Sequence, residues 1–121
     1  MALPYALVVE DDPLVAELFR RALQDAGYQA DVLENGHRAQ AQLAFTTPDL
    51  IVIDLLMPTM SGGVLLRQIR GQQRLWHTRV IVATGDGDAA EPLRPVADEV
   101  LIKPIGYEKL RSVAAQYLPA I

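Results

Sequence analysis

Four short runs of apolar residues set the strongest limit on what this chain can fold into. The runs cover residues 5–9, 50–53, 80–83 and 100–102, and none of them alternates polar with apolar side chains. Alternation is typical of a strand with one solvated face, so its absence predicts strands that are buried on both faces of a parallel sheet. A fifth segment, residues 28–33, does alternate and predicts a strand at the edge of that sheet.

The first helix is predicted between the first run and the alternating segment. Its apolar residues recur at three- and four-residue steps and form one stripe that should face the sheet. The stripe consists of Leu14, Val15, Leu18, Phe19, Ala22, Leu23 and Ala26. Asp12 can cap the free amides, Pro13 suits the first helical position, and Gly27 can end the helix in a left-handed conformation.

Further helices separate the remaining strands. They are predicted over about residues 36–45, after Ser61, and from Tyr107 onward. Another helix should fall within residues 85–98, where two glycines and two prolines predict that it is short or irregular. Alternation of strands and helices predicts an α/β fold, a doubly wound parallel sheet with helices on both faces, as a single domain over residues 1–121.

Composition excludes several functional classes. The chain has 121 residues, which is long enough to bury a core without a disulfide or a structural metal. It lacks cysteine, so thiolate zinc sites and thiol nucleophiles are excluded. Its 15 acidic and 11 basic residues give a net charge of −4, which argues against direct binding of nucleic acid. No basic segment precedes the first apolar run, which argues against a signal peptide or a membrane span, and we expect a cytoplasmic protein.

Polar residues follow the predicted strands where each strand ends. Because ligands of an open parallel sheet bind beyond the carboxyl ends of its strands, these residues should meet at one edge. They are Glu10, Asp11 and Asp12 after the first strand, Asp54 after the third, Thr84 after the fourth and Lys103 after the last. Close carboxylates repel each other by about 4 kcal/mol per pair at an effective dielectric constant near 20. Since Lys103 offsets a single charge, we predict a hard divalent cation, and Mg²⁺ suits a few carboxylates and several waters best.

The same residues predict chemistry at phosphorus. Asp54 lies where a carboxylate nucleophile should lie, and a metal ion with a fixed ammonium group would neutralise charge on the transferring oxygens. The Thr84 hydroxyl can donate a hydrogen bond to a bound phosphoryl oxygen and so report its presence to the following loop.

Four segments resemble the receiver domain of two-component response regulators. They are residues 8–13 (VVEDDP), 54–62 (DLLMPTMSG), 83–85 (ATG) and 102–104 (IKP), which occur in family order and span essentially the whole chain. The resemblance implies a flavodoxin-like fold with five strands in the order 2-1-3-4-5. It also implies that Asp54 accepts a phosphoryl group from a histidine kinase or a phosphotransfer protein, with Mg²⁺ required.

The resemblance assigns roles to further residues. Glu10 and Asp11 match the acidic pair that binds the metal ion, and the main-chain carbonyl of Leu56 matches the third protein contact to it. Thr84 and Lys103 match the hydroxyl and the lysine of the family pattern. The Lys103-Pro104 peptide bond is usually cis in the family. The resemblance implies a signalling switch that catalyses only its own phosphorylation and dephosphorylation, and we expect a monomer or a weak dimer.

One position departs from the family pattern, and another flanks the site where members of the family vary. The family usually has tyrosine or phenylalanine three residues before the lysine, where this chain has Val100. Valine cannot make the ring rotation, so we predict that the aromatic half of the usual switch is missing or replaced. Leu56, two residues after Asp54, cannot orient a water molecule and would occupy its path. We therefore predict slow hydrolysis of the aspartyl phosphate.

Two other functions stay open at this stage. A receiver-fold interaction module that does not depend on phosphate would fit Val100 and the irregular fourth helix. A haloacid-dehalogenase-like phosphatase would also use an aspartate after a strand, but it requires a second aspartate where Leu56 stands. Met57 and Trp76 are interpreted as packing residues.

Overall fold

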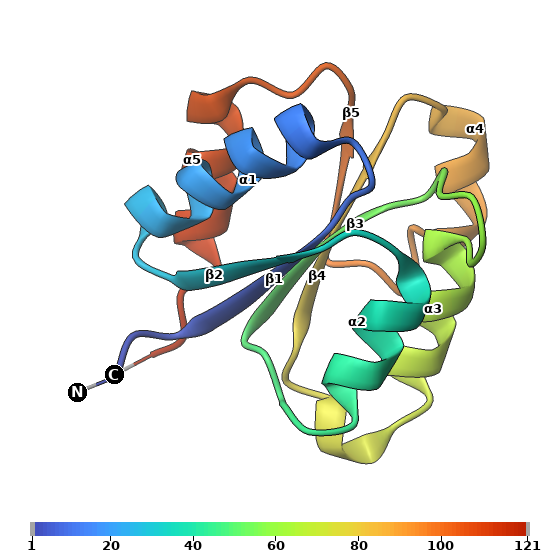
Figure 1. Cartoon of the computed structure of the whole chain (residues 1–121), viewed down its shortest axis with the longest axis horizontal. Coiled ribbons are helices and arrows are strands. Elements are labelled where there is room, and N and C mark those ends of the chain that lie inside the picture. Colours follow the sequence, from blue (N-terminus) through green and yellow to red (C-terminus); the bar gives the residue numbers. More distant parts are fainter. Residues whose placement is uncertain (1, 121) are drawn as a thin grey trace.

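Five parallel strands form a sheet in the order β2-β1-β3-β4-β5 (Figure 1). The computed structural model describes residues 2–120. The strands are β1 (Tyr5–Val9), β2 (Gln29–Leu33), β3 (Leu50–Asp54), β4 (Arg79–Thr84) and β5 (Glu99–Ile102). This confirms the predicted flavodoxin-like order, with the alternating strand β2 at one edge.

Helices cover both faces of the sheet. Figure 1 shows α1 (Pro13–Ala26) and α5 (Tyr107–Gln116) on one face, and α2 (Gly36–Leu43), α3 (Gly62–Arg70) and α4 (Gly87–Ala90) on the other. Two short 3₁₀ helices, η1 (Gln73–Leu75) and η2 (Glu91–Leu93), follow α3 and α4. Within residues 2–120, no helix has the length and apolar character needed to cross a membrane.

The predicted signals at the helix ends are present. The Asp12 carboxylate accepts hydrogen bonds from the amides of Leu14 (2.9 Å) and Val15 (3.3 Å) at the start of α1. Gly27 ends α1 with a φ of 118°, which favours glycine. Helix α2 ends at Leu43, two residues before its predicted end, as fraying and turn residues at helix ends commonly allow.

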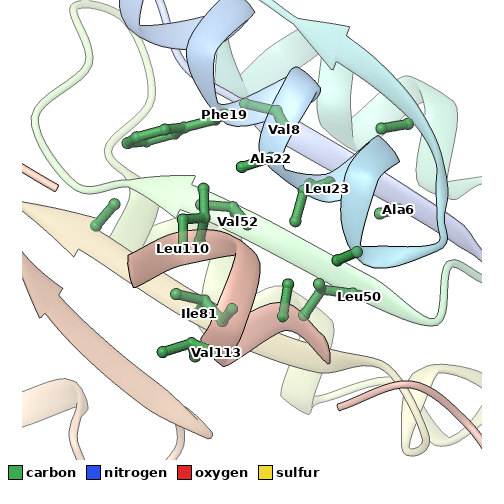
Figure 2. Close-up of a cluster of buried hydrophobic side chains, with 14 of the residues drawn as sticks. Ala6, Val8, Phe19, Ala22, Leu23, Leu50, Val52, Ile81, Leu110 and Val113 are labelled. Atoms are coloured by element: carbon green, nitrogen blue, oxygen red, sulfur yellow. The ribbon is translucent and has the colours of Figure 1, made fainter. Parts of the chain in front are cut away.

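Two hydrophobic cores lie on opposite faces of the sheet. Alternate residues of a strand point to opposite faces, so Ala6 and Val8 pack beneath α1 and α5, whereas Leu7 and Val9 pack beneath α2 and α3. Figure 2 shows the first core, where Leu110 of α5 lies near the apolar side chains of the sheet. The two cores explain why the central strands lack alternation.

Some expectations about burial were wrong. Strand β5 is not buried on both faces, because it lies at the sheet edge and leaves Ile102 47% exposed. Leu14 is 83% exposed and Leu18 is also exposed, because the apolar stripe of α1 is wider than the strip that the sheet and α5 cover. Trp76, predicted to pack, is 65% exposed because it stands at the outer end of η1.

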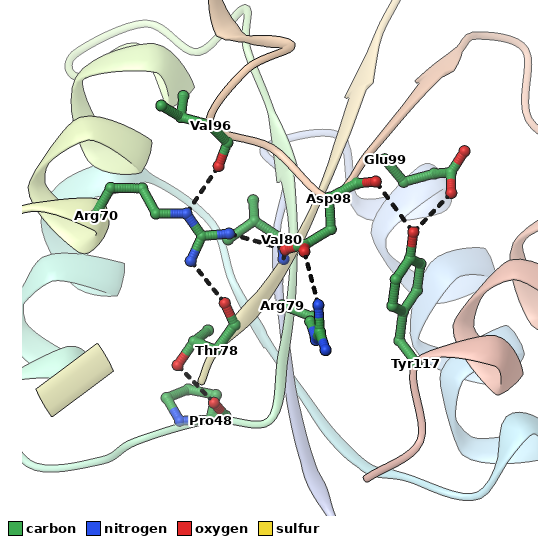
Figure 3. Close-up of polar contacts among 9 residues, drawn as sticks. All are labelled: Pro48, Arg70, Thr78, Arg79, Val80, Val96, Asp98, Glu99 and Tyr117. Carbon is green, nitrogen blue, oxygen red and sulfur yellow. Dashed lines mark hydrogen bonds and ion pairs between the residues drawn. The ribbon is translucent and has the colours of Figure 1, made fainter. Parts of the chain in front are cut away.

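The fourth helix is short, as predicted, and a polar cluster holds the segment that follows it (Figure 3). The Arg70 guanidinium donates from three nitrogens, to the carbonyl of Val96 (2.7 Å), the carbonyl of Thr78 (2.8 Å) and the carboxylate of Asp98 (2.8 Å). Asp98 also accepts from Arg79 (3.1 Å) and from the Val80 amide (2.7 Å). Arg70 therefore ties α3 to the start of β4 and to the segment before β5.

Replacing Arg70 with lysine should lower the free energy of unfolding by about 1–3 kcal/mol, because an ammonium group cannot donate along three fixed directions to these partners. Urea unfolding measures the change, and faster hydrogen exchange of the Val96 and Asp98 amides would locate it. Arg20→Lys, which alters an exposed pair with Glu17, is the matched control and should change stability by less than about 0.5 kcal/mol. Equal effects of the two substitutions would contradict the prediction.

Replacing Gly62 with alanine should lower the free energy of unfolding by about 1–3 kcal/mol. A Cβ at this position would overlap the carbonyl oxygen of Asp54 and lie 2.6 Å from Ile53 Cγ2, so β3 and α3 would have to separate. Gly85→Ala is the control, because nothing lies within 4 Å of a Cβ there, and it should change stability by less than about 0.5 kcal/mol. Chemical denaturation that finds the two variants equally stable would refute this account.

Candidate functional site

The polar residues predicted to meet at one edge of the sheet are placed there. Glu10 and Asp11 follow β1, Asp54 ends β3, Thr84 ends β4 and Lys103 follows β5. In the register, Val9 pairs with Ile53, so the next residues, Glu10 and Asp54, continue two adjacent strands. Parallel pairing alone therefore brings the first two carboxylates together.

Three carboxylates form a tight cluster at this edge. One carboxylate oxygen from each of Glu10, Asp11 and Asp54 lies within 4.8 Å of the others. The side chains of Glu10 and Asp54 are buried, whereas Asp11 is exposed. The cluster thus has a buried floor and one side that faces solvent.

Lys103 is the cation of the cluster. Its Nζ lies 3.2 and 3.1 Å from the two carboxylate oxygens of Glu10 and 3.5 Å from Oδ2 of Asp54. The Lys103-Pro104 peptide bond is cis, in agreement with the family pattern. One ammonium group is therefore shared between the two buried carboxylates.

The electrostatics of the cluster leave an excess of negative charge. Burial, together with the hydrogen bond and negative charge of Asp54, raises the pKa of the Glu10 carboxyl to about 7, although Lys103 acts to lower it. One lysine thus does not neutralise the buried pair. Three hard carboxylate oxygen donors at this spacing, one of them open to solvent, fit a small divalent cation such as Mg²⁺.

Thr84 is buried at the end of β4, and its hydroxyl is held within the following loop. The Asp86 amide donates to Thr84 Oγ1 (3.1 Å), and the hydroxyl donates a long hydrogen bond to the Asp86 carbonyl (3.4 Å). The Lys103 amide donates to the Thr84 carbonyl at 2.8 Å, which links this strand end to the lysine. A small movement of this loop would therefore change the hydrogen-bond partner of the Thr84 hydroxyl.

Leu56 contributes a group that the sequence reasoning missed. Its main-chain amide donates to Oδ1 of Asp54 at 3.1 Å, and its side chain is exposed beside that carboxylate. The predicted role of Leu56, a main-chain carbonyl contact to a metal ion, stays a prediction. No sequence signal identifies the amide contact, because every residue except proline has an amide at that place.

The glycine that begins α3 was also missed as a site residue. Gly62 lies against the carbonyl oxygen of Asp54, and its amide donates to the Leu55 carbonyl at 3.2 Å. The glycine after Ser61 in the DLLMPTMSG segment was an available signal for this close approach.

Val100 stands where the family usually has tyrosine or phenylalanine. Its side chain is partly buried against the core beneath α2 and α3.

Comparisons with known proteins agree with this geometry. The family described as response regulator receiver domain matches residues 6–115. The chain is 31% identical to the phosphate regulon transcriptional regulatory protein PhoB of Rhizobium meliloti over 111 residues, which cover 89% of this chain and 49% of that protein. It thus spans about half the length of this relative.

Solved structures of similar sequence have the same fold. The signal receiver domain of a signal transduction histidine kinase from Syntrophus aciditrophicus is 37% identical, with a TM-score of 0.84 and coverage of 95% of this chain and 89% of that one. The response regulator TrrA from Thermotoga maritima, in complex with Mg²⁺ and BeF, is 28% identical, with a TM-score of 0.84 and coverage of 95% and 99%. By fold, site geometry and sequence match, this chain belongs to the response regulator receiver domain family.

Proposed function

We propose that this chain is a phosphorylation-dependent switch of a two-component phosphorelay, and that Asp54 accepts the phosphoryl group. The observation that carries the proposal is the cluster of Glu10, Asp11 and Asp54 within 4.8 Å, with Lys103 in contact with both buried carboxylates. A histidine kinase or a phosphotransfer protein is the proposed donor. Residues 1–121 would act as one receiver domain.

The three carboxylates would hold Mg²⁺, together with the main-chain carbonyl of Leu56. When bound, Mg²⁺ supplies positive charge that neutralises the oxygens of the transferring phosphoryl group. The response regulator TrrA is a similar protein whose structure contains Mg²⁺ and BeF. The donor set supports the same cation here, because all of its ligand atoms are hard oxygens.

In the transfer, a carboxylate oxygen of Asp54 forms a bond to phosphorus while the bond between phosphorus and the donor histidine nitrogen breaks. The Leu56 amide, 3.1 Å from Oδ1, holds the carboxylate in one orientation. Lys103 already lies 3.5 Å from Oδ2 and can pair with a phosphoryl oxygen without a large movement. Hydrolysis restores the Asp54 carboxylate: water attacks phosphorus, the bond between phosphorus and the Asp54 oxygen breaks, and inorganic phosphate is released.

Thr84 would report the phosphoryl group to the loop that follows it. Its hydroxyl now bonds within that loop, at Asp86. Donation to a phosphoryl oxygen instead would release the Asp86 carbonyl and shift the start of α4. The segment after α4 is held by Arg70, so the movement should be concentrated between Thr84 and Ala90.

This chain offers the donor protein an apolar surface beside Lys103. A groove of about 370 Å³ is lined by Val15, Leu18, Phe19, Lys103, Pro104 and Ile105. The exposed side chain of Leu14 extends the apolar surface along α1. A donor helix with an apolar face can bury these side chains and present its histidine to Asp54.

Incubation with acetyl phosphate and Mg²⁺ should add one phosphoryl group to the chain, measured as intact mass. Asp54→Asn should abolish the gain, since an amide oxygen is a poor nucleophile, and chelation of Mg²⁺ with EDTA should abolish it as well. Asp49→Asn is the matched control and should leave the gain unchanged, because Asp49 lies at the other end of β3. A gain that persists in Asp54→Asn would overturn the assignment of the acceptor.

Replacing Leu56 with asparagine should speed hydrolysis of the aspartyl phosphate by about tenfold, equivalent to about 1.4 kcal/mol of barrier, because an amide can orient the attacking water. Release of phosphate from the phosphorylated chain over time measures the rate. Leu56→Ala separates the two causes, since it opens the path without orienting water. An asparagine variant that loses phosphate no faster than the wild type counts against this role for Leu56.

A further inference from the structure

We propose that the face formed by α2, α3 and η1 binds an acidic protein segment that carries a large apolar side chain. The part of this face around the ends of α2 and α3 and the starts of β3 and β4 lies at the opposite end of the sheet from Asp54 (Figure 1), whereas the start of α3, at Gly62, lies against Asp54. The inference goes beyond the phosphorelay function and does not rest on it. We call this surface the α2–α3 face, defined by residues 36–48 and 62–79.

Charge is segregated on the α2–α3 face. The chain has a net charge of −4, yet residues 36–48 and 62–79 contain no aspartate or glutamate. Their basic side chains are Arg38, Arg67, Arg70, Arg74, Arg79 and two histidines. These two segments are therefore positive on a chain that is negative as a whole, although Arg79 lies over the ring of Tyr117 and not beside α2.

Two of the five arginines have no carboxylate partner in the part of the chain that the structure describes, and two others share a single carboxylate. Arg38 pairs with Glu34 at 3.1 Å, and Arg70 and Arg79 share the single carboxylate of Asp98. Arg67 is exposed and forms no ion pair within residues 2–120, and Arg74 bonds only main-chain carbonyls there. Uncompensated guanidinium groups attract a carboxylate-bearing partner and bind it in a bidentate manner.

A groove between α2 and α3 provides an apolar pocket within this positive surface. Its volume is about 230 Å³. Its apolar part consists of Leu43, Ala44, Leu65 and Ile69, and its rim consists of Gln40, Gln68, Gln72 and Arg74. A groove of this size is small for a drug-sized ligand but suits one leucine or phenylalanine side chain of a partner.

Two exposed aromatic side chains follow α2 and η1 in the chain, although Trp76 lines a separate hollow with Arg70 and Pro95. Phe45 is 87% exposed just after α2, and Trp76 is 65% exposed just after η1. Arg74 donates to the carbonyls of Leu43 and Thr46, on either side of Phe45 in the chain, so this guanidinium is held against the main chain after α2. Aromatic residues and arginine are enriched at the centres of protein interfaces, because they bury large areas at low entropic cost.

The occupant is an acidic protein segment rather than a second copy or a nucleic acid. A second copy placed symmetrically on this face would oppose arginines to arginines, which costs several kcal/mol through like-charge repulsion. Nucleic acid would leave the apolar part of the groove unfilled and would be repelled by the net charge of −4. In a segment where glutamates flank a leucine and a phenylalanine, the glutamates can pair with the arginines and an apolar side chain can fill the groove.

A labelled peptide makes the proposal directly testable. The probe is a short synthetic peptide that carries a fluorescein label and in which glutamates flank a Leu-Phe pair. Its fluorescence anisotropy should rise when the chain is added, and added salt should weaken its binding. The same peptide with glutamine in place of glutamate should bind at least about tenfold more weakly.

Variants of residues that form no bonds within the fold separate binding from stability. Arg67→Glu and Phe45→Ala should each weaken peptide binding by at least about tenfold, and both should fold like the wild type because these side chains are exposed. Arg21→Glu on α1, in the opposite layer, is the matched control and should leave binding unchanged. Asp54→Asn should also bind normally, so failure of the phosphorelay function would leave this test intact.

Three outcomes would overturn the proposal. The first is an unchanged anisotropy of the labelled glutamate peptide when the chain is added, or an equal effect of Arg67→Glu and Arg21→Glu. The second is tighter binding of single-stranded oligothymidylate than of the peptide. The third is self-association in sedimentation velocity that Phe45→Ala abolishes, since that result would assign the face to a second copy.

Discussion

Parallel pairing of strands that are buried on both faces is the constraint on which the rest of this structure depends. It aligns the ends of β1 and β3, so that the pairing of these strands is enough to place Glu10 and Asp54 side by side. It also removes these carboxylates from water, which makes their mutual repulsion costly and gives Lys103 its position between them. The chemistry of the site thus follows from the geometry of the sheet.

The two ends of the sheet serve different purposes. At the carboxyl end, acids gather around one lysine, and the hydroxyl of Thr84 is held by hydrogen bonds to Asp86. At the amino end, Arg70 holds the segment before β5 through three donors. The segment between the short fourth helix and β5 is therefore anchored by polar contacts at the end of the sheet away from the carboxylates.

Much of the site was predictable, because its polar residues directly follow strands that the sequence marks clearly and because parallel strands end at one edge of a sheet. Asp54, Thr84 and Lys103 each follow an apolar run, and the rule that parallel strands end at one edge brings them together. The caps of α1 and the shortness of α4 were also predictable, since proline and glycine limit the backbone wherever they occur. By contrast, the amide of Leu56 on Asp54 was not, because main-chain groups leave no mark in a sequence.

By itself, the sequence determined which side chains share a face, where helices begin and end, and which residues close each strand, since these depend on near neighbours in the chain. Tertiary structure alone decided what covers each face. The exposure of Leu14, Trp76 and Ile102 depends on how far neighbouring elements extend over them. The periodicity of a helix or strand does not specify the length or position of the elements that pack against it. The Arg70 cluster and the positive α2–α3 face likewise arise because distant segments meet, which depends on packing and not on local propensity.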